Sequence, residues 1–237
     1  MKQRSAVRSK GSGSIAKGSG DKAKRNGDRA KRRDGELPPP PHLPVSPSLS
    51  TWRTFCAVEL PDSVRAQLQD HASRLREAVS EASASWSRPE NVHLTLKFFG
   101  NVPTQSLSEI SAAASRVAKE FSSFQIRIGG TGVFPRRSRP QVLWIGVEDS
   151  SGHLSDLQQR LEEEFEREGF PKDDRGFRPH LTIARLRRPE DARQLAEAHI
   201  QTKFSLIEVP VREFVLFRSE MSPKGSRYTA ISKHELI

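Results

Sequence analysis

The hydrophobic pattern divides the chain at about residue 50. Residues 1–50 contain no Phe, Trp or Tyr and few apolar positions of any kind. From residue 52 onward, apolar positions recur either at every second residue, which is typical of strands, or at every third to fourth, which is typical of amphipathic helices. We therefore predict a folded part over residues 51–237, preceded by a segment that has no core of its own.

The folded part alternates predicted strands and helices. Strands are predicted over residues 53–60, 92–98, 124–128, 142–147, 204–209, 211–218 and 227–232, with a further strand beginning near residue 180. Helices are predicted after Pro61, Pro103 and Pro189, because proline is favoured in the first helical turn, and around residues 154–165. Residues 129–140 are rich in Gly and Pro and are predicted to be a loop.

One four-residue pattern occurs twice, as His93-Leu94-Thr95-Leu96 and as His180-Leu181-Thr182-Ile183. On a strand, alternate side chains point to the same face. Each imidazole therefore shares a face with the hydroxyl two residues later, while the Leu and Ile side chains pack on the other face. Two such strands can direct two histidines at one site.

The 87-residue spacing of the two patterns extends to their surroundings. Applied to the first predicted strand, it places Phe55 on Val142 and Ala57 on Trp144, within another predicted strand. The predicted helices correspond in the same way. We infer an α+β fold of two pseudo-symmetric lobes, each with an antiparallel sheet and two helices, and an active-site cleft between them.

Charge is concentrated in the N-terminal segment. Of the formal net charge of +10, residues 1–50 supply twelve Lys and Arg against four Asp and Glu, whereas residues 51–237 carry 27 basic and 25 acidic groups. We predict that residues 1–50 form a disordered basic tail that ends in a Pro-rich linker. Such a tail either contacts RNA non-specifically or only aids solubility, and the sequence leaves both open.

The remaining composition limits the compartment and the other candidate residues. The single cysteine, Cys56, excludes an intramolecular disulfide and is expected in the core. The start of the chain lacks an apolar signal region and no segment is long enough to span a membrane, so we expect a cytoplasmic protein. We also expect a monomer. His71, His153, His199 and His234 stand outside the repeated pattern and are expected to be exposed or incidental.

Two histidines facing one cleft are suited to acid–base chemistry at phosphorus. One imidazole removes a proton from water while the other protonates the leaving oxygen on the opposite side. Thr95 and Thr182 would donate hydrogen bonds to the phosphate oxygens, and Arg185 would add a charge-assisted one. A zinc site is the alternative, but Thr is a poor zinc ligand and the chain has no H-E-x-x-H sequence, so no metal site is predicted.

These residues resemble a known group of enzymes. HLTLKFFG at 93–100 and FRPHLTIARL at 177–186, with RTFCAVELP, PQVLWIGV and the final FVLFRSEMSPKGSRYTAI, are similar to the 2H phosphoesterase superfamily. Within it, the chain resembles the RNA 2',3'-cyclic phosphodiesterases of the LigT/ThpR type, also described as 2'-5' RNA ligases. The resemblance covers residues 52–237 and leaves out the basic tail.

The resemblance implies an enzyme that hydrolyses 2',3'-cyclic phosphate ends of RNA to 2'-phosphomonoesters, without metal or organic cofactor. It implies His93 as proton donor to the 3'-oxygen and His180 as proton acceptor that activates water. Thr95 and Thr182 correspond to phosphate-binding residues, and Arg185 to a basic residue after the second motif. The alternatives are 2'-5' RNA ligation at the same site and a non-catalytic module that binds RNA ends.

Five further positions have two possible interpretations. Arg136, Arg137 and Arg139 either contact RNA phosphates or simply form an exposed basic loop. Phe99 and Phe134 are expected in the core, and stacking on a base at the mouth of the cleft is the alternative.

Overall fold

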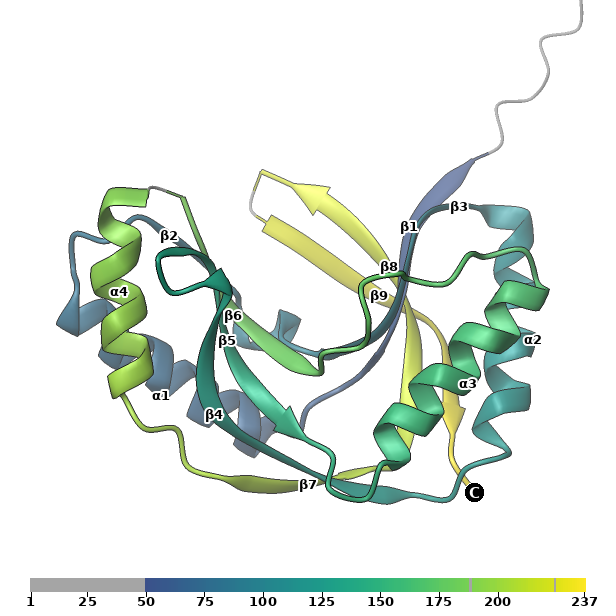
Figure 1. Ribbon diagram of the computed structural model, residues 1–237. Coiled ribbons are helices and arrows are strands. Elements are labelled where there is room, and N and C mark those ends of the chain that lie inside the picture. Colours follow the sequence, from purple (N-terminus) through teal and green to yellow (C-terminus); the bar gives the residue numbers. More distant parts are fainter. Residues whose placement is uncertain (1–49, 188, 224) are drawn as a thin grey trace, which may run out of the picture. The chain divides into compact units, whose positions relative to one another are not determined.

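The computed structural model describes residues 50–187, 189–223 and 225–237 (Figure 1). The basic tail and linker predicted over residues 1–50 lie, except for Ser50, outside the described residues. In the described part, the α+β class expected from the sequence is confirmed.

The strands form two antiparallel sheets. Sheet A has the order β3 (Leu94–Pro103), β1 (Thr51–Val58), β8 (Glu213–Ser222) and β9 (Gly225–Glu235). Sheet B has the order β2 (Ala84–Trp86), β6 (His180–Leu186), β5 (Arg139–Glu148), β4 (Phe124–Arg136) and β7 (Ile207–Val211). Each sheet thus carries one of the two His-x-Thr segments. In sheet A, His93 immediately precedes β3 and Thr95 lies on it, and in sheet B the segment begins β6.

Two helices cover one face of each sheet. Helices α2 (Leu107–Ala118) and α3 (His153–Arg167) pack together over sheet A, and α1 (Asp62–Ala78) and α4 (Pro189–Gln201) pack together over sheet B (Figure 1). The spacing of Leu154, Leu157 and Leu161 explains the packing of α3, since it places all three on one stripe and none of them is exposed. We call the face opposite the helices the inner face of each sheet.

The two lobes do not coincide with the two halves of the sequence. Helix α1 follows β1 of sheet A but packs with α4 on sheet B, and α3 follows β5 of sheet B but packs with α2 on sheet A. Likewise β4 pairs with β5, and β8 pairs with β1. The halves have exchanged equivalent elements, which preserves the pseudo-symmetry and ties the lobes together.

Residues 129–140 are not the loop that their composition predicts. Strand β4 runs through to Arg136 and β5 begins at Arg139, so this segment is mostly a β-hairpin with two irregularities in its register. Gly132 has a packing role here: a Cβ on it would lie 2.0 Å from Cζ2 of Trp144. The glycine thus leaves room for an indole ring rather than ending the strand. The short strand β2 was not predicted.

Three of the histidines expected to be exposed are buried. His71 and His199 are fully buried and hydrogen-bonded to each other, with Nε2 of His71 3.0 Å from Nδ1 of His199. His234 is 3% exposed and lies between the hydroxyls of Ser115 and Ser232. Of the two expected possibilities, exposed or incidental, exposure is wrong for these three because their rings find hydrogen-bond partners in the core. His153 is exposed as expected, and the buried Cys56 confirms a core role.

Candidate active site

The two His-x-Thr segments share the same backbone irregularity. In sheet A, Ala57 pairs with Thr95 and Cys56 with Lys97, so Leu96 is an extra residue. In sheet B, Trp144 pairs with Thr182 and Leu143 with Ala184, so Ile183 is the extra residue. A β-bulge of this kind changes the direction of the side chains around it. Both bulges occur at equivalent positions, immediately after the threonine.

Both histidines are also held in the same way. Nδ1 of His93 lies 2.9 Å from the carbonyl oxygen of Asn91, and Nδ1 of His180 lies 2.7 Å from that of Arg178. A carbonyl only accepts, so each Nδ1 carries the proton and donates it. The neutral rings therefore have their basic lone pair on Nε2, the atom that remains for substrate or water.

The ring of His93 lies on an aromatic floor. It stacks on Phe55 with ring centroids 4.6 Å apart, and the edge of Tyr228 contacts it at 5.3 Å. Phe217 extends this floor by stacking on the other side of Phe55. These contacts fix the plane of the imidazole, so that the hydrogen bond to Asn91 determines its remaining orientation.

His180 has different neighbours. Phe134 meets it edge to face with centroids 5.0 Å apart, and Trp144 lies further away at 6.5 Å. The indole of Trp144 occupies the inner face opposite Thr182, where the equivalent position in sheet A is the small Ala57. The two histidines therefore share their backbone anchoring and differ in their surroundings.

The two motif strands come together between the lobes. Strands β3 and β6 contact each other although they belong to different sheets. Burial lowers the pKa of His93 to about 4; the hydrogen bond to Asn91 opposes this shift, and the nearby His180 adds to it. With this pKa, His93 is neutral at pH 7.

The register places the predicted binding residues on the inner faces. Thr182 pairs with Trp144 and Arg185 with Val142, and these two β5 residues point to the same side because strands alternate. Thr95 shares the inner face of sheet A with Ala57. At the position equivalent to Arg185, sheet A has Phe98, which pairs with Phe55 and is 43% exposed.

The remaining candidate residues separate into core and surface. Phe99 packs edge to face on Phe165 and Phe170, so its expected core role is confirmed. Phe134 is half-buried on the inner face against His180 rather than deep in the core. Arg136, Arg137 and Arg139 are exposed at the end of the β4–β5 hairpin.

Sequence reasoning missed the residues that position His93. Asn91 belongs to the short helix η1 (Pro89–Asn91), and its side-chain amide donates to the carbonyl oxygen of Ser226, 2.7 Å away. This bond joins the loop before the first motif to strand β9. The 87-residue spacing relates Asn91 to Arg178, so it could have indicated the two anchoring positions. The contacts of Tyr228 and Phe55 with His93 could not be predicted, because they depend on the folded sheet.

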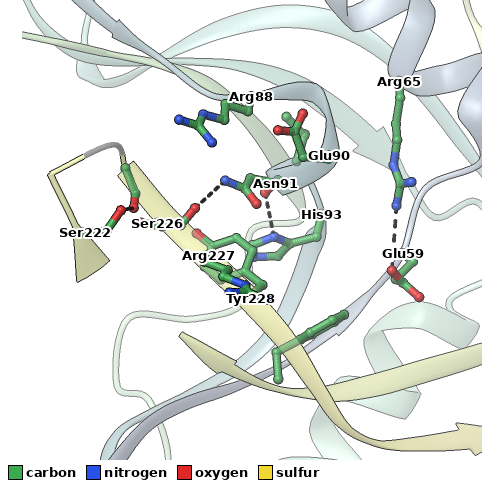
Figure 2. Close-up of a pocket in the computed structure, with 13 residues that line it drawn as sticks. Glu59, Arg65, Arg88, Glu90, Asn91, His93, Ser222, Ser226, Arg227 and Tyr228 are labelled. Atoms are coloured by element: carbon green, nitrogen blue, oxygen red, sulfur yellow. Dashed lines mark hydrogen bonds and ion pairs between the residues drawn. The ribbon is translucent and has the colours of Figure 1, made fainter. Parts of the chain in front are cut away.

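A pocket adjoins the candidate site, and His93 forms part of its wall. It has a volume of about 420 Å³ and lies between η1, the β8–β9 hairpin and the start of α1 (Figure 2). Its lining includes His93, Asn91, Tyr228 and Arg227 but not His180.

Comparison with known proteins decides the family. The family model of the 2'-5' RNA ligase superfamily matches residues 60–222. The chain belongs to the 2'-5' RNA ligase superfamily. Among curated members, it is 38% identical over 182 residues to the RNA 2',3'-cyclic phosphodiesterase of Methanothermobacter thermautotrophicus, covering 75% of this chain and 95% of that protein. It is 34% identical to the one of Thermotoga maritima, over 76% and 92%.

Solved structures of 2'-5' RNA ligase superfamily proteins agree with the observed fold. A Thermus thermophilus protein matches with a TM-score of 0.62 and 30% identity, over 78% of this chain and 97% of that one. The E. coli protein LigT in complex with 3'-AMP matches with a TM-score of 0.62 and 28% identity, over 79% and 99%. The bilobal arrangement expected from the repeated motif is confirmed.

Two further features bear on the predicted properties of the site. Within the described residues, no three His, Cys, Asp or Glu side chains gather as a metal-binding group. A search of the same residues for a helix both long and apolar enough to cross a bilayer found none.

Proposed function

We propose that this protein hydrolyses 2',3'-cyclic phosphate ends of RNA to 2'-phosphomonoesters by acid–base catalysis between His93 and His180. The observation that carries the proposal is the matched pair of His-x-Thr segments, each with Nδ1 anchored on a carbonyl and Nε2 left for chemistry. Relatives that share 38% and 34% of their residues with this chain are RNA 2',3'-cyclic phosphodiesterases.

In the proposed reaction, Nε2 of His180 takes a proton from water as the water oxygen bonds to phosphorus. The bond from phosphorus to the 3'-oxygen breaks, and Nε2 of His93 gives its proton to that oxygen. Thr95, Thr182 and Arg185 donate hydrogen bonds to the non-bridging oxygens, where negative charge accumulates. The phosphate remains on the 2'-oxygen, and the two histidines finish with their protons exchanged.

The role of His93 as the acid requires the substrate. Burial lowers the pKa of His93 to about 4, so the empty enzyme has little of the protonated form at pH 7. A bound phosphodiester carries a negative charge, which raises the pKa of a neighbouring imidazole. We expect a bell-shaped pH profile whose alkaline limb lies at higher pH for kcat, which reports the complex, than for kcat/KM, which reports the free enzyme. Coincident limbs would contradict this assignment.

The decisive experiment offers the protein both possible reactions. RNA that ends in a 2',3'-cyclic phosphate is incubated with 5'-hydroxyl RNA, with and without EDTA, and the yields of 2'-phosphate and of 2'-5' linkage are compared. We expect 2'-phosphate to dominate and EDTA to have no effect. Dominant ligation would assign the site to the reverse reaction, and binding without turnover would make the protein an RNA-end binding module.

For the basic segment 1–50, we propose a separate role in holding longer RNA by non-specific attraction. Its twelve Lys and Arg against four Asp and Glu support this. Deletion of residues 1–50 should weaken binding of long RNA at low salt and leave turnover of a cyclic mononucleotide unchanged. Equal affinity of the shortened and full-length proteins for long RNA would refute it.

A further inference from the structure

The pocket beside His93 is larger than a phosphate group alone requires. A volume of about 420 Å³ lies within the range of pockets that bind small organic ligands. The pocket continues from His93 along the β8–β9 hairpin, so that an occupant would extend from the reacting phosphate toward Arg227 (Figure 2).

The lining of this pocket is suited to a nucleotide. Its charged lining residues are three arginines, at positions 65, 88 and 227, against the two carboxylates of Glu59 and Glu90. The polar side chains of Asn91, Ser222 and Ser226 and the ring of Tyr228 complete the wall that a nucleotide would contact. Arg65 forms ion pairs with Glu59 at 3.7 Å and Asp62 at 3.3 Å. Arg227 is exposed, and within the described part of the chain it has neither a hydrogen-bond nor an ion-pair partner for its side chain. Its guanidinium is therefore available to a phosphate.

The walls of the pocket are joined to the segment that orients His93. The side-chain amide of Asn91 donates to Ser226, while the backbone carbonyl of the same residue accepts from His93. The hydroxyl of Ser222 donates to the carbonyl oxygen of Gly225 at 2.8 Å, and this bond stabilises the end of the β8–β9 hairpin. These bonds within the protein hold the pocket walls in a defined position relative to His93.

The chemistry of the reaction determines which part of the substrate lies on this side. His93 protonates the leaving 3'-oxygen, so the ribose that bears this oxygen must be on the His93 side, and water must approach from His180. The RNA strand continues from the 5'-oxygen of the same ribose. We propose that the pocket binds the strand on the 5' side of the cyclic phosphate and that Arg227 contacts the phosphodiester joining the last two nucleotides; this rests on the proposed function.

A competing path would lead the strand over the β4–β5 hairpin. Arg136, Arg137 and Arg139 are exposed there, on the lobe of His180. The pocket, however, reaches His93 and does not include His180 or any of these arginines. The observations therefore favour the β8–β9 side, and the hairpin arginines supply a control of matched chemistry.

The test compares two substrates that differ by one nucleotide, and therefore by the phosphodiester that Arg227 is proposed to contact. Hydrolysis of adenosine 2',3'-cyclic phosphate and of an adenylyl dinucleotide with a 2',3'-cyclic phosphate end is measured for the wild type, Arg227→Ala, Arg227→Lys and Arg137→Ala. We expect Arg227→Ala to reduce kcat/KM for the dinucleotide about fivefold more than for the mononucleotide, mainly through KM, because one charge-assisted contact is lost. Arg227→Lys should restore part of the preference and Arg137→Ala should retain it.

Each other outcome has a definite meaning. If Arg227→Ala retains the ratio of the two substrates, or if Arg137→Ala is the variant that loses it, the assignment of the strand to this pocket is overturned. If the wild type hydrolyses neither substrate, the proposed function itself fails. Circular dichroism of the exposed-arginine variants, expected to match the wild type, excludes misfolding as the cause of a changed ratio.

Discussion

The inner faces of the two lobes share the backbone features of their motif strands and differ in the side chains around them. Opposite Thr95, sheet A has Ala57, whose neighbour on β8 is Val215; opposite Thr182, sheet B has Trp144, whose neighbour on β4 is Gly132. In sheet A the floor beneath the histidine is made by Phe55 instead. The bulge, the threonine and the carbonyl anchor are duplicated, but the packing around them is not.

This difference shows how a duplicated framework can hold two histidines in unlike surroundings. The shared anchor fixes Nδ1 as the donor in both rings, which leaves the basic lone pair on Nε2 in both neutral rings. The surroundings of the two histidines then differ: burial lowers the pKa of His93, and the pocket described above is lined by His93 and not by His180. The repeated backbone gives both histidines the same anchor, and the packing of each lobe gives them different neighbours.

The largest expected effect is the loss of either histidine. His93→Ala and His180→Ala should each reduce kcat/KM by about 10²- to 10⁴-fold, the usual contribution of a general acid or base. The alkaline limb of the pH profile should disappear in the His93 variant and the acidic limb in the His180 variant. The exposed His153→Ala is the control. Loss of the same limb in both variants would show that the lobes do not divide the roles.

Next in size is the contrast between Arg185 and Phe98, which occupy equivalent positions. Arg185→Ala should reduce kcat/KM by about 10- to 100-fold, because a hydrogen bond from a charged donor contributes about 1.5–3 kcal/mol. Phe98→Ala should have a smaller effect, since the ring of Phe98 has no charge to offer the phosphate. Steady-state kinetics with a cyclic mononucleotide measures both, and equal losses would mean that the substrate contacts both lobes alike.

A smaller effect is expected from filling the space beneath Trp144. A Cβ at residue 132 would approach ring atoms of Trp144 to 2.0–2.5 Å, so Gly132→Ala should destabilise the protein by about 1–3 kcal/mol, as overpacking does. Urea unfolding measures this change. In a Trp144→Leu background the same substitution should cost less, and an equal cost in both backgrounds would show that the two residues are not coupled.

The smallest effect at neutral pH concerns buried histidines. Burial lowers the pKa of His71 to about 4, with His199 and Arg74 adding to the shift. Between pH 6.5 and 4, the unfolded chain binds a proton at residue 71 that the folded chain does not bind, so the free energy of unfolding decreases as pH falls. His71→Phe should flatten this dependence in urea titrations at about pH 7, 6 and 5, which span the ordinary histidine pKa. An unchanged slope would exclude His71 as its source.

The candidate site could be predicted from sequence because its key residues are local. The order His, apolar, Thr, apolar places both functional side chains on one strand face, whatever surrounds the strand. The 87-residue spacing also gave the equivalence of Arg185 and Phe98. The loop expected over residues 129–140 is wrong because the reason for its glycine is not local. Gly132 leaves room for the indole of Trp144, which belongs to another strand.

Sequence alone thus determined the two motifs, the order of the helices and of the strands other than β2, and the family features carried by residues 52–237. The tertiary structure decided which helices cover which sheet, that His71, His199 and His234 are buried, and that the pocket opens at His93. Periodicity shows that an apolar face exists but not which partner covers it, because both sheets present similar apolar faces to helices of similar pattern. Only the folded chain selects the partner, and with it the difference between the two histidines.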